Sequence, residues 1–346
     1  MTDAIDRAVA TLFLALSQLP ECPEEPGDCF FLNAHPHPAL SQWRGRLVCE
    51  QAFKPYADSL AATGIQVFPA IDTDTVGGFS LGLYLPSRQH EEILWHFARA
   101  LALLKPGGVL VCAMANALGA KRYETLLGRL CGGVQGLVKH KCRGFWVRRA
   151  ETLDSHLQAE WLRRGEERPI LEGRFVSRPG CFCWDGIDRG TRLLVEHLPQ
   201  DLAGHGADLG AGFGAIGEFL LRHRPEITAL DCYEADYRAL ALARRNLEAI
   251  PTRTRLRGYW QDVTTGLPGG PYDWIVMNPP CHDAGGYRPD LGQAFLQAAA
   301  ESLKPGGRLW LVANRQLPYE KLLSKTLRNI ESLSEADGFK ILFARK

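Results

Sequence analysis

The sequence predicts an α/β protein with two similar domains, each a mostly parallel, twisted sheet flanked by helices. Three observations predict this class. A five-residue motif, Leu-Lys-Pro-Gly-Gly, stands at 104–108 and again at 303–307. Helical and strand-like stretches follow each other through most of the chain, which is typical of βαβ units in parallel sheets. The segments on either side of the two motifs also match in kind and order.

Each copy of the motif stands between a helical stretch and a buried strand. The helical stretches cover 91–104 and 293–303, and the apolar, strand-like runs cover 109–116 and 309–314. We expect the proline of the motif to end the helix. We expect its two glycines to allow the positive φ of a tight connection.

Both copies then continue alike. Tyr-Glu at 123–124 and 319–320 opens another helical pattern, and Gly-Phe at 144–145 and 338–339 begins a strand-like tail. A chance match of one short motif would not reproduce these features in the same order, so we expect a duplicated domain.

The length of the chain agrees with such a duplication, because 346 residues suit about two domains. We place the first domain at 1–150 and the second at 191–346. Between them, 151–190 begins as a charged helical stretch and then becomes extended. This pattern predicts a linking segment.

Composition excludes several classes of protein. Lys and Arg number 40 and Asp and Glu 39, so a generally polybasic protein is excluded and nucleic-acid binding needs a local cluster. No apolar run reaches the ~20 residues that cross a bilayer. Asp3 and Asp6 precede the first apolar stretch, which favours an amphipathic helix over a secretory signal. The ten cysteines form no Cys-x-x-Cys pair, so we expect reduced thiols, a cytoplasmic protein and no metal.

A glycine-rich turn in the second half is typical of a nucleoside-cofactor site. It occupies 208–214, between the end of a strand and the start of a helix. Glycines let the backbone approach a ligand closely, and a helix N-terminus favours electron-rich groups. Glu234 ends the next strand, where its carboxylate can accept both hydroxyls of a ribose. We therefore predict that Gly210, Gly212, Gly214 and Glu234 bind a cofactor.

The spacing of these glycines also satisfies the dinucleotide fingerprint of NAD-binding proteins. Two features favour S-adenosyl-L-methionine (SAM) over NAD. Asp208 directly precedes the glycines, where it would repel a pyrophosphate but can bind the cationic amino group of a methionine moiety. The second feature is Asn278-Pro279-Pro280, which ends another strand at the edge where open α/β sheets bind ligands.

Asn-Pro-Pro has a chemical rationale. An amine conjugated to a base is a poor nucleophile, because its lone pair is delocalised. The Asn278 side-chain oxygen and the Pro279 carbonyl can accept its two hydrogens and aim the lone pair at a methyl group, while Pro280 helps to stiffen the turn. We predict that these three residues are catalytic through positioning and electrostatics, without a general base. The alternative is an ordinary turn, which Asn-Pro also marks.

A polar pair follows the third strand of the second half. Gln261 and Asp262 come directly after the strand-like stretch 254–258. Because this strand should end at the same edge of the sheet, we predict that both residues meet the adenine of the cofactor. The alternative is an ordinary loop aspartate.

Positive charge is concentrated in the first half, at 121–149, where eight Lys and Arg residues accompany a single acid, Glu124. Five more arginines at 163–178 extend the cluster. We interpret it as a track for RNA phosphates that positions RNA without reading sequence, with Lys139, Lys141 and Arg143 in contact. A solvated helix face is the alternative.

The chain resembles the bacterial ribosomal RNA guanine-N2 methyltransferases of the RsmC/RlmG type in the segments 179–194, 208–217, 278–283 and 309–320. The resemblance implies two tandem Rossmann-like class I methyltransferase domains, of which the first has lost cofactor binding and assists RNA binding. It implies methyl transfer from SAM to the N2 amine of a guanine, with ribosomal RNA or a ribosomal subunit as partner. Methylation of adenine N6 or glutamine N5, or RNA binding without catalysis, remain alternatives.

The resemblance also implies roles for the segment before the glycine loop. In this family that segment lies over the cofactor, so Phe182, Asp185 and Asp188 are expected to border its methionine end. The alternative is a capped turn before a helix from Thr191.

One residue departs from the family pattern. Members commonly have phenylalanine after Asn-Pro-Pro, where it stacks on the target base, but this chain has Cys281. Stacking is worth roughly 1–3 kcal/mol per base. The ring would then have to come from Phe182, Trp184, His282 or Tyr287. We include Cys281, His282 and Phe182 among the predicted substrate-binding residues.

The first half lacks a comparable site. At 45–55, where we expect the glycine loop, the sequence has no glycine cluster. The strand before the helix at 91–104 ends at 83–88 without Asn-Pro-Pro. We therefore predict no cofactor in this half, and a monomeric protein with one active site.

Overall fold

The computed structural model describes most of the chain. The described residues are 4–19, 28–71, 78–280, 282–283, 286–287 and 289–346. The chain divides after Glu167 into two compact units.

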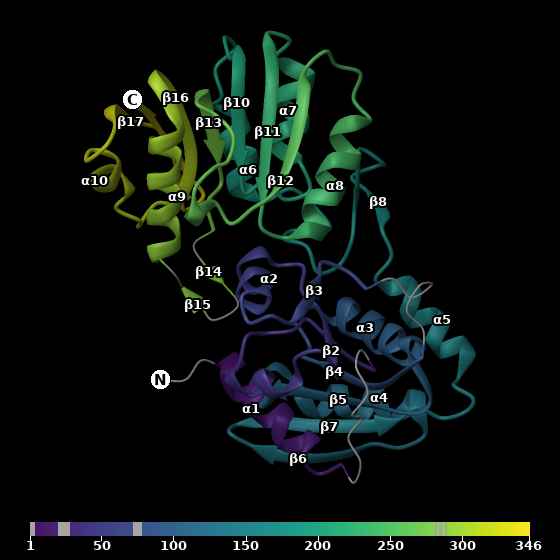
Figure 1. Cartoon of the computed structure of the whole chain (residues 1–346). Helices are drawn as coiled ribbons and strands as arrows, with labels where there is room; N and C mark the ends of the chain where they lie inside the picture. The colour runs from purple at the N-terminus through teal and green to yellow at the C-terminus, as the bar shows by residue number, and fades with distance from the viewer. Residues whose placement is uncertain (1–3, 20–27, 72–77, 281, 284–285, 288) are drawn as a thin grey trace. The chain divides into compact units, whose positions relative to one another are not determined.

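The first unit contains a seven-stranded sheet in the order β3-β2-β1-β4-β5-β7-β6 (Figure 1). Its strands are β1 (Cys29–Leu32), β2 (Leu47–Glu50), β3 (Gln66–Phe68), β4 (Phe79–Tyr84), β5 (Leu104–Ala115), β6 (Gln135–Lys139) and β7 (Cys142–Arg148). The first five run parallel, and β7 and β6 are added antiparallel.

The second unit repeats this order strand for strand, as β12-β11-β10-β13-β16-β18-β17 (Figure 1). Its strands are β10 (Gly204–Leu209), β11 (Ile227–Glu234), β12 (Arg255–Trp260), β13 (Tyr272–Met277), β16 (Leu303–Asn314), β17 (Arg328–Ala336) and β18 (Phe339–Arg345). Again five strands are parallel and the last two antiparallel. The predicted fold class, two mostly parallel sheets flanked by helices, is confirmed.

Helices and short 3-10 turns connect the strands. In the first unit they are α1 (Ala4–Leu16), η1 (Pro38–Trp43), α2 (Lys54–Ala61), α3 (His90–Leu103), η2 (Asn116–Leu118), α4 (Ala120–Cys131) and α5 (Ser155–Arg164). In the second they are α6 (Arg189–Glu196), α7 (Ala215–His223), α8 (Tyr237–Glu248), η3 (Val263–Thr265), α9 (Pro289–Ser302) and α10 (Tyr319–Leu323). Two hairpins, β8 (Arg168–Ile170) with β9 (Phe175–Ser177) and β14 (His282–Asp283) with β15 (Gly286–Tyr287), complete the second unit.

The second sheet is buried on both faces. On one face Leu220 of α7 and Leu247 of α8 pack in a cluster with Val276 of β13. On the other, Ala299 of α9 packs in a cluster with Ile275 of the same strand. Because both faces of β13 are covered, its sequence is a nearly continuous apolar run and does not alternate between apolar and polar residues.

The repeated Leu-Lys-Pro-Gly-Gly motif behaves differently from our expectation. The preceding helix, α3, ends at Leu103, before Pro106, as expected, but β5 already begins at Leu104, so no separate turn connects the two. The motif therefore lies inside the strand. Gly107 and its equivalent Gly306 do adopt positive φ, of 79° and 78°, and the pairing with the neighbouring strand shifts register there. The motif forms a bulge because the positive φ bends the strand without ending it.

The segment predicted as a linker, 151–190, is divided between the two units. Its helix, α5, packs on α3 in the first unit, where Trp161 joins the buried core. Its hairpin belongs to the second unit, where Asn246 of α8 binds both backbone polar groups of Val176 in β9, at 2.8 and 3.0 Å.

Candidate active site

The carboxyl edge of the second sheet brings together three parts of the predicted site. In the pairing register, Leu209 of β10 lies beside both Tyr233 of β11 and Met277 of β13. The residues that follow these strands therefore meet at one edge: the glycine loop, Glu234 and Asn278. This is the edge at which open α/β sheets bind ligands.

The glycine loop needs glycine for two different reasons. Gly210, Gly212 and Gly214 all have positive φ, of 79°, 56° and 96°. A Cβ atom at Gly214 would lie 3.2 Å from the backbone of Ala243, so that glycine allows α8 to pack closely. A Cβ atom at Gly212 would meet nothing within 4 Å. Gly212 therefore lies on the open side of the loop, where a ligand can approach the backbone.

Glu234 connects its strand to this loop. Its Oε2 accepts the backbone N–H of Gly212 at 2.7 Å, and its Oε1 accepts the N–H of Asp236 at 2.9 Å. Burial raises the pKa of Glu234 to about 7, and the charge of Asp236 adds to this while the backbone N–H groups oppose it. Each carboxylate oxygen can accept more than one hydrogen bond, so acceptor capacity remains for two ribose hydroxyls.

Asp208 is a buried carboxyl group to which the protein supplies no strong hydrogen-bond partner. It is fully buried in β10, and neither carboxylate oxygen makes a full hydrogen bond within the described residues. Burial raises its pKa to about 8, the charge of Glu234 adds to the shift, and the Gly217 backbone N–H opposes it. Burying a carboxylate without a partner is costly. The residue therefore suits a cationic group supplied by a ligand, as the sequence predicts for the methionine amine of SAM.

We expect Asp208→Asn to change how the stability of the ligand-free protein depends on pH. A carboxyl whose pKa is higher in the folded state than in the unfolded chain stabilises the fold at low pH. That contribution is lost as pH rises from about 4 to about 8, because over this range the carboxyl ionises in the unfolded chain while the buried one stays protonated. In thermal melts, the variant should gain a few degrees of Tm over the original protein between about pH 5 and pH 8.

The exposed turn residue Asp337 provides the control. The difference in Tm between Asp337→Asn and the original protein should stay constant over the same pH range, because this side chain lies at the surface. A constant difference for Asp208→Asn as well would contradict the raised pKa.

Asn278 lines a cavity of about 60 Å³ together with Gly210, Gly212, Asp188 and Phe182. Its side-chain amide nitrogen donates to a carboxylate oxygen of Asp188 at 2.9 Å. The cavity thus lies between the glycine loop, the Asn-Pro-Pro turn and the segment 182–188, which we call the covering segment because we predicted that it lies over the cofactor. Glu234 is not among the residues that line this cavity.

The covering segment follows the predictions in part. Asp188 caps α6, where it accepts the Thr191 N–H, so the capping interpretation is confirmed. It also lines the cavity, and its contact with the cofactor stays a prediction. Phe182 lines the cavity and is 68% exposed, and its contact with a base stays a prediction. Trp184 instead lies under the Arg168 guanidinium, 4.8 Å from the ring centroid. Asp185 is exposed and does not line the cavity.

The turn after Asn278 is described only in part. Pro279 is buried and Pro280 half-buried, in keeping with a rigid turn. Cys281 lies outside the described residues. His282 lies in β14, where its backbone pairs with that of Tyr287 in β15. The substrate-binding roles of these residues stay predictions.

Gln261 and Asp262 are engaged in shaping their own loop. The Gln261 amide donates to the Gly266 carbonyl at 3.0 Å, and Asp262 Oδ1 accepts the Thr264 N–H at 2.9 Å. Asp262 thereby caps η3. Both residues follow β12 at the expected edge, and contact with adenine stays a prediction.

The first unit has a corresponding edge of its own sheet. The sequence analysis placed the counterpart of the glycine loop at 45–55, and this prediction is wrong. β1 occupies the place that β10 has in the second sheet, so the glycine loop corresponds to 33–37. The segment 45–55 contains β2 instead. β1 and β2 are both four-residue strands, and only the order of strands in the sheet shows which of them corresponds to β10.

At this edge an arginine neutralises the counterpart of Glu234. β2 ends at Glu50, as β11 ends at Glu234. Arg99 of α3 donates to both carboxylate oxygens of Glu50, at 2.7 and 2.6 Å, and both side chains are buried. This carboxylate is therefore committed to an internal ion pair.

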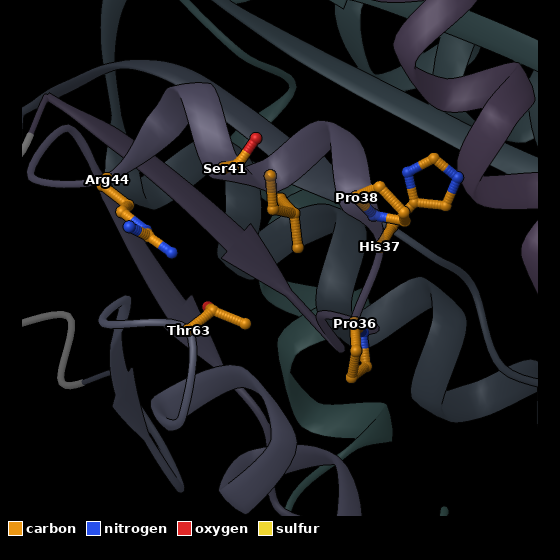
Figure 2. A pocket seen from close by; sticks show the side chains of 7 residues that line it. Pro36, His37, Pro38, Ser41, Arg44 and Thr63 are labelled. Atoms are coloured by element: carbon orange, nitrogen blue, oxygen red, sulfur yellow. The ribbon is translucent and has the colours of Figure 1, made fainter.

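The first unit also has a hollow of about 310 Å³, lined by η1 and its flanking residues and by Thr63 after α2. Figure 2 shows Pro36, Pro38, Ser41, Arg44 and Thr63 around it, while the ring of His37 points away. No carboxylate lines this hollow, so it lacks the donor set of the site in the second unit.

The basic cluster is partly neutralised by its single acid. Glu124 is buried and accepts hydrogen bonds from Arg143, at 3.1 Å, and from Lys121, at 2.7 Å. Lys139 and Lys141 are exposed, at the end of β6 and in the turn to β7. Arg143 is thus occupied within the protein, and the two lysines are the better candidates for phosphate contact.

Within the part of the chain that the structure describes, no group of His, Cys, Asp and Glu residues could hold a metal ion. Nor does any helix among these residues have the length and apolar character needed to cross a membrane.

Comparisons with known proteins identify the family of the second unit and of most of the chain. The family model "Methyltransferase small domain" matches residues 172–343. Ribosomal RNA small subunit methyltransferase C of Pseudomonas aeruginosa (strain UCBPP-PA14) is 31% identical over 272 residues, which cover 76% of this chain and 78% of that protein. The protein of the same name from Psychromonas ingrahamii is 26% identical over 272 residues, covering 76% and 75%.

A solved structure shares the whole two-unit fold. The T. thermophilus 16S rRNA N2 G1207 methyltransferase (RsmC), in complex with AdoMet and guanosine, superposes with a TM-score of 0.79 at 24% identity. The match covers 97% of this chain and 92% of that one.

Proposed function

The chain belongs to the family of ribosomal RNA small subunit methyltransferase C, and we propose that it methylates the exocyclic N2 amine of a guanine in ribosomal RNA. The methyl donor is SAM. The observation that carries the proposal is the position of Asn278, which lines one cavity with the glycine loop. An amide at that place can hold an amine next to a cofactor.

The residues at the edge of the second sheet fit SAM. A buried carboxyl group that has only a weak contact with the Gly217 N–H, Asp208, suits a cationic amine. Gly212 offers open backbone, and Glu234 ends β11 where it can accept ribose hydroxyls. When bound, SAM supplies an electrophilic methyl group on a sulfonium sulfur, which keeps the electron pair of the broken bond.

The Asn-Pro-Pro turn prepares the amine for methyl transfer. The Asn278 side-chain oxygen and the Pro279 carbonyl accept the two hydrogens of the guanine amine. Its lone pair is thereby withdrawn from conjugation and directed toward the methyl group. Because the nitrogen becomes cationic on methylation, it then loses a proton to water without a strong base. Catalysis of this kind relies on positioning and preorganised electrostatics.

RNA binding falls to the first unit in this proposal. The target guanine has to be unpaired or flipped out to reach Asn278, which costs a few kcal/mol. Contacts between Lys139, Lys141 and RNA phosphates would offset part of this cost. We further propose that the protein acts as a monomer in the cytoplasm, where ribosomal subunits are found.

The double variant Lys139→Ala with Lys141→Ala should bind RNA more weakly and with a shallower salt dependence. Each lost phosphate contact reduces the slope of log K against log salt by about 0.7–0.9, so two contacts should reduce it by roughly 1.5. The measurement is a salt series of RNA-binding titrations. The control is Lys321→Ala with Lys325→Ala, two exposed lysines in α10 and just after it, and an equal effect there would argue against the assignment.

The proposed reaction is tested with tritiated SAM and small ribosomal subunits, or their naked RNA, from cells that lack the enzyme. Nucleoside mass mapping should find N2-methylguanosine at one position. Label in N6-methyladenosine, or in release-factor protein instead of RNA, would replace the proposal with one of the other amine methylations. RNA binding without any incorporated label would point to a non-catalytic protein.

A further inference from the structure

Two residues of the segment before the glycine loop, Asp188 and Thr191, hold the side chain of Asn278. Its amide nitrogen donates to Asp188 Oδ2 and to Thr191 Oγ1, each at 2.9 Å. Both partners lie at the start of α6, where Asp188 also accepts the backbone N–H of Thr191 at 3.1 Å. Thr191 is buried, with 8% of its surface exposed. It was not among the predicted site residues, because no local pattern marks a threonine in the first turn of a helix.

The chemistry of Asp188 determines which way the amide faces. A carboxylate only accepts hydrogen bonds, so the Asn278 atom that faces it has to be the NH2 group. One hydrogen of that group goes to Asp188 and the other to Thr191. The side-chain oxygen therefore points away from both. Rotating the amide by half a turn would place this oxygen against the carboxylate, which is repulsive.

The start of α6 is held firmly in this place. A Cβ atom at Gly190 would lie 3.0 Å from Asp188 Oδ2 and 3.1 Å from Val312 of β16. The first turn of the helix is thus packed against the sheet with no room for a side chain at Gly190. Asp188 and Thr191 consequently present fixed acceptors to Asn278.

We propose that Thr191 and Asp188 are positioning residues for methyl transfer, which orient the Asn278 amide so that its oxygen meets the amine of the target base. The proposal rests on the function proposed above. With the opposite orientation, the NH2 group of Asn278 would face the hydrogens of the substrate amine, and the turn could not accept them. Preorganised acceptors of this kind act in the transition state more than in cofactor binding.

The first test separates catalysis from cofactor binding. Thr191→Val keeps the volume of the side chain but removes the acceptor. We expect kcat to fall about 10-fold or more, while the Kd for SAM, measured by calorimetry, stays within about 2-fold. Thr191→Ser restores the hydroxyl and should recover most of the rate. Thr252→Val, at an exposed loop position, is the control for a general threonine effect.

Asp188→Asn provides a second variant in case Thr191→Val folds poorly. Its single amide oxygen can still cap α6, but without the charge it no longer discriminates between the two orientations of Asn278. We expect a smaller fall in kcat, about 3- to 10-fold. A Kd for SAM that rises in step with the loss of kcat, in either variant, would assign these residues to cofactor binding and overturn the proposal.

The second test does not depend on activity. In the full chain labelled with ¹⁵N-asparagine, the side-chain NH2 signal of Asn278 is identified by its absence in Asn278→Ala. Both of its hydrogens should exchange slowly with water, and Thr191→Val should accelerate one of them. Equally fast exchange in both proteins would overturn the proposal. An original enzyme that labels no guanine would instead refute the proposed function, while this NMR result would still stand.

Discussion

Asn278→Ala should reduce the rate of methyl transfer by about 100- to 1000-fold, the range observed when one preorganised hydrogen-bonding group is removed from an active site. The alanine leaves Pro279 as the only acceptor for the substrate amine, so the lone pair of the nitrogen stays delocalised. Binding of SAM should change by less than about 3-fold, because the carboxylates of Asp208 and Glu234 and the glycine loop remain.

Single-turnover rates with saturating RNA and tritiated SAM measure the chemical step directly, and calorimetry measures the affinity for SAM. Gln297→Ala, which removes an exposed amide from α9 in the same unit, is the matched control and should keep the original rate. Turnover near the original level in Asn278→Ala would exclude the role of this residue in orienting the amine.

Glu234→Ala should weaken the affinity for SAM about 100-fold or more. The substitution removes acceptors for the ribose hydroxyls, and it also frees the Gly212 N–H that Glu234 now holds at 2.7 Å. Hydrogen bonds to a charged group are worth about 1.5–3 kcal/mol each, so losing two is enough for this effect. Calorimetric titration with SAM is the direct measurement.

Glu234→Gln separates the two contributions. Glutamine keeps one acceptor oxygen for Gly212 but not the negative charge, so we expect an intermediate loss of about 10-fold. Glu248→Ala removes an exposed carboxylate from α8 and should leave the affinity for SAM unchanged. An unaltered Kd in Glu234→Ala would mean that the ribose is bound elsewhere.

Much of the fold and part of the site could be predicted because their signals are local in sequence. The duplicated Leu-Lys-Pro-Gly-Gly motif and its neighbours indicated two equivalent sheets, which the identical strand orders confirm. Asp208, Glu234 and Asn278 were recognisable since each stands next to the end of an apolar strand. The carboxyl ends of adjacent parallel strands lie at one edge, so these positions alone placed them together.

Other features depended on which strands are neighbours, and no local pattern contains that information. The counterpart of the glycine loop in the first unit was sought one strand too far along, at 45–55. Only the sheet order assigns it to 33–37, after the four-residue β1. The Glu50–Arg99 ion pair, formed across 49 residues of sequence, could not have been predicted for the same reason.

The sequence by itself therefore determined the class of fold, the cofactor loop and the Asn-Pro-Pro turn, since short-range order and strand ends encode them. The tertiary structure alone decided which side chains are available for chemistry. It paired Arg143 with Glu124 and left Lys139 and Lys141 exposed. It also brought Thr191 to Asn278 across 87 residues. Hydrogen bonds and ion pairs between distant segments form only when packing brings their partners within about 3 Å.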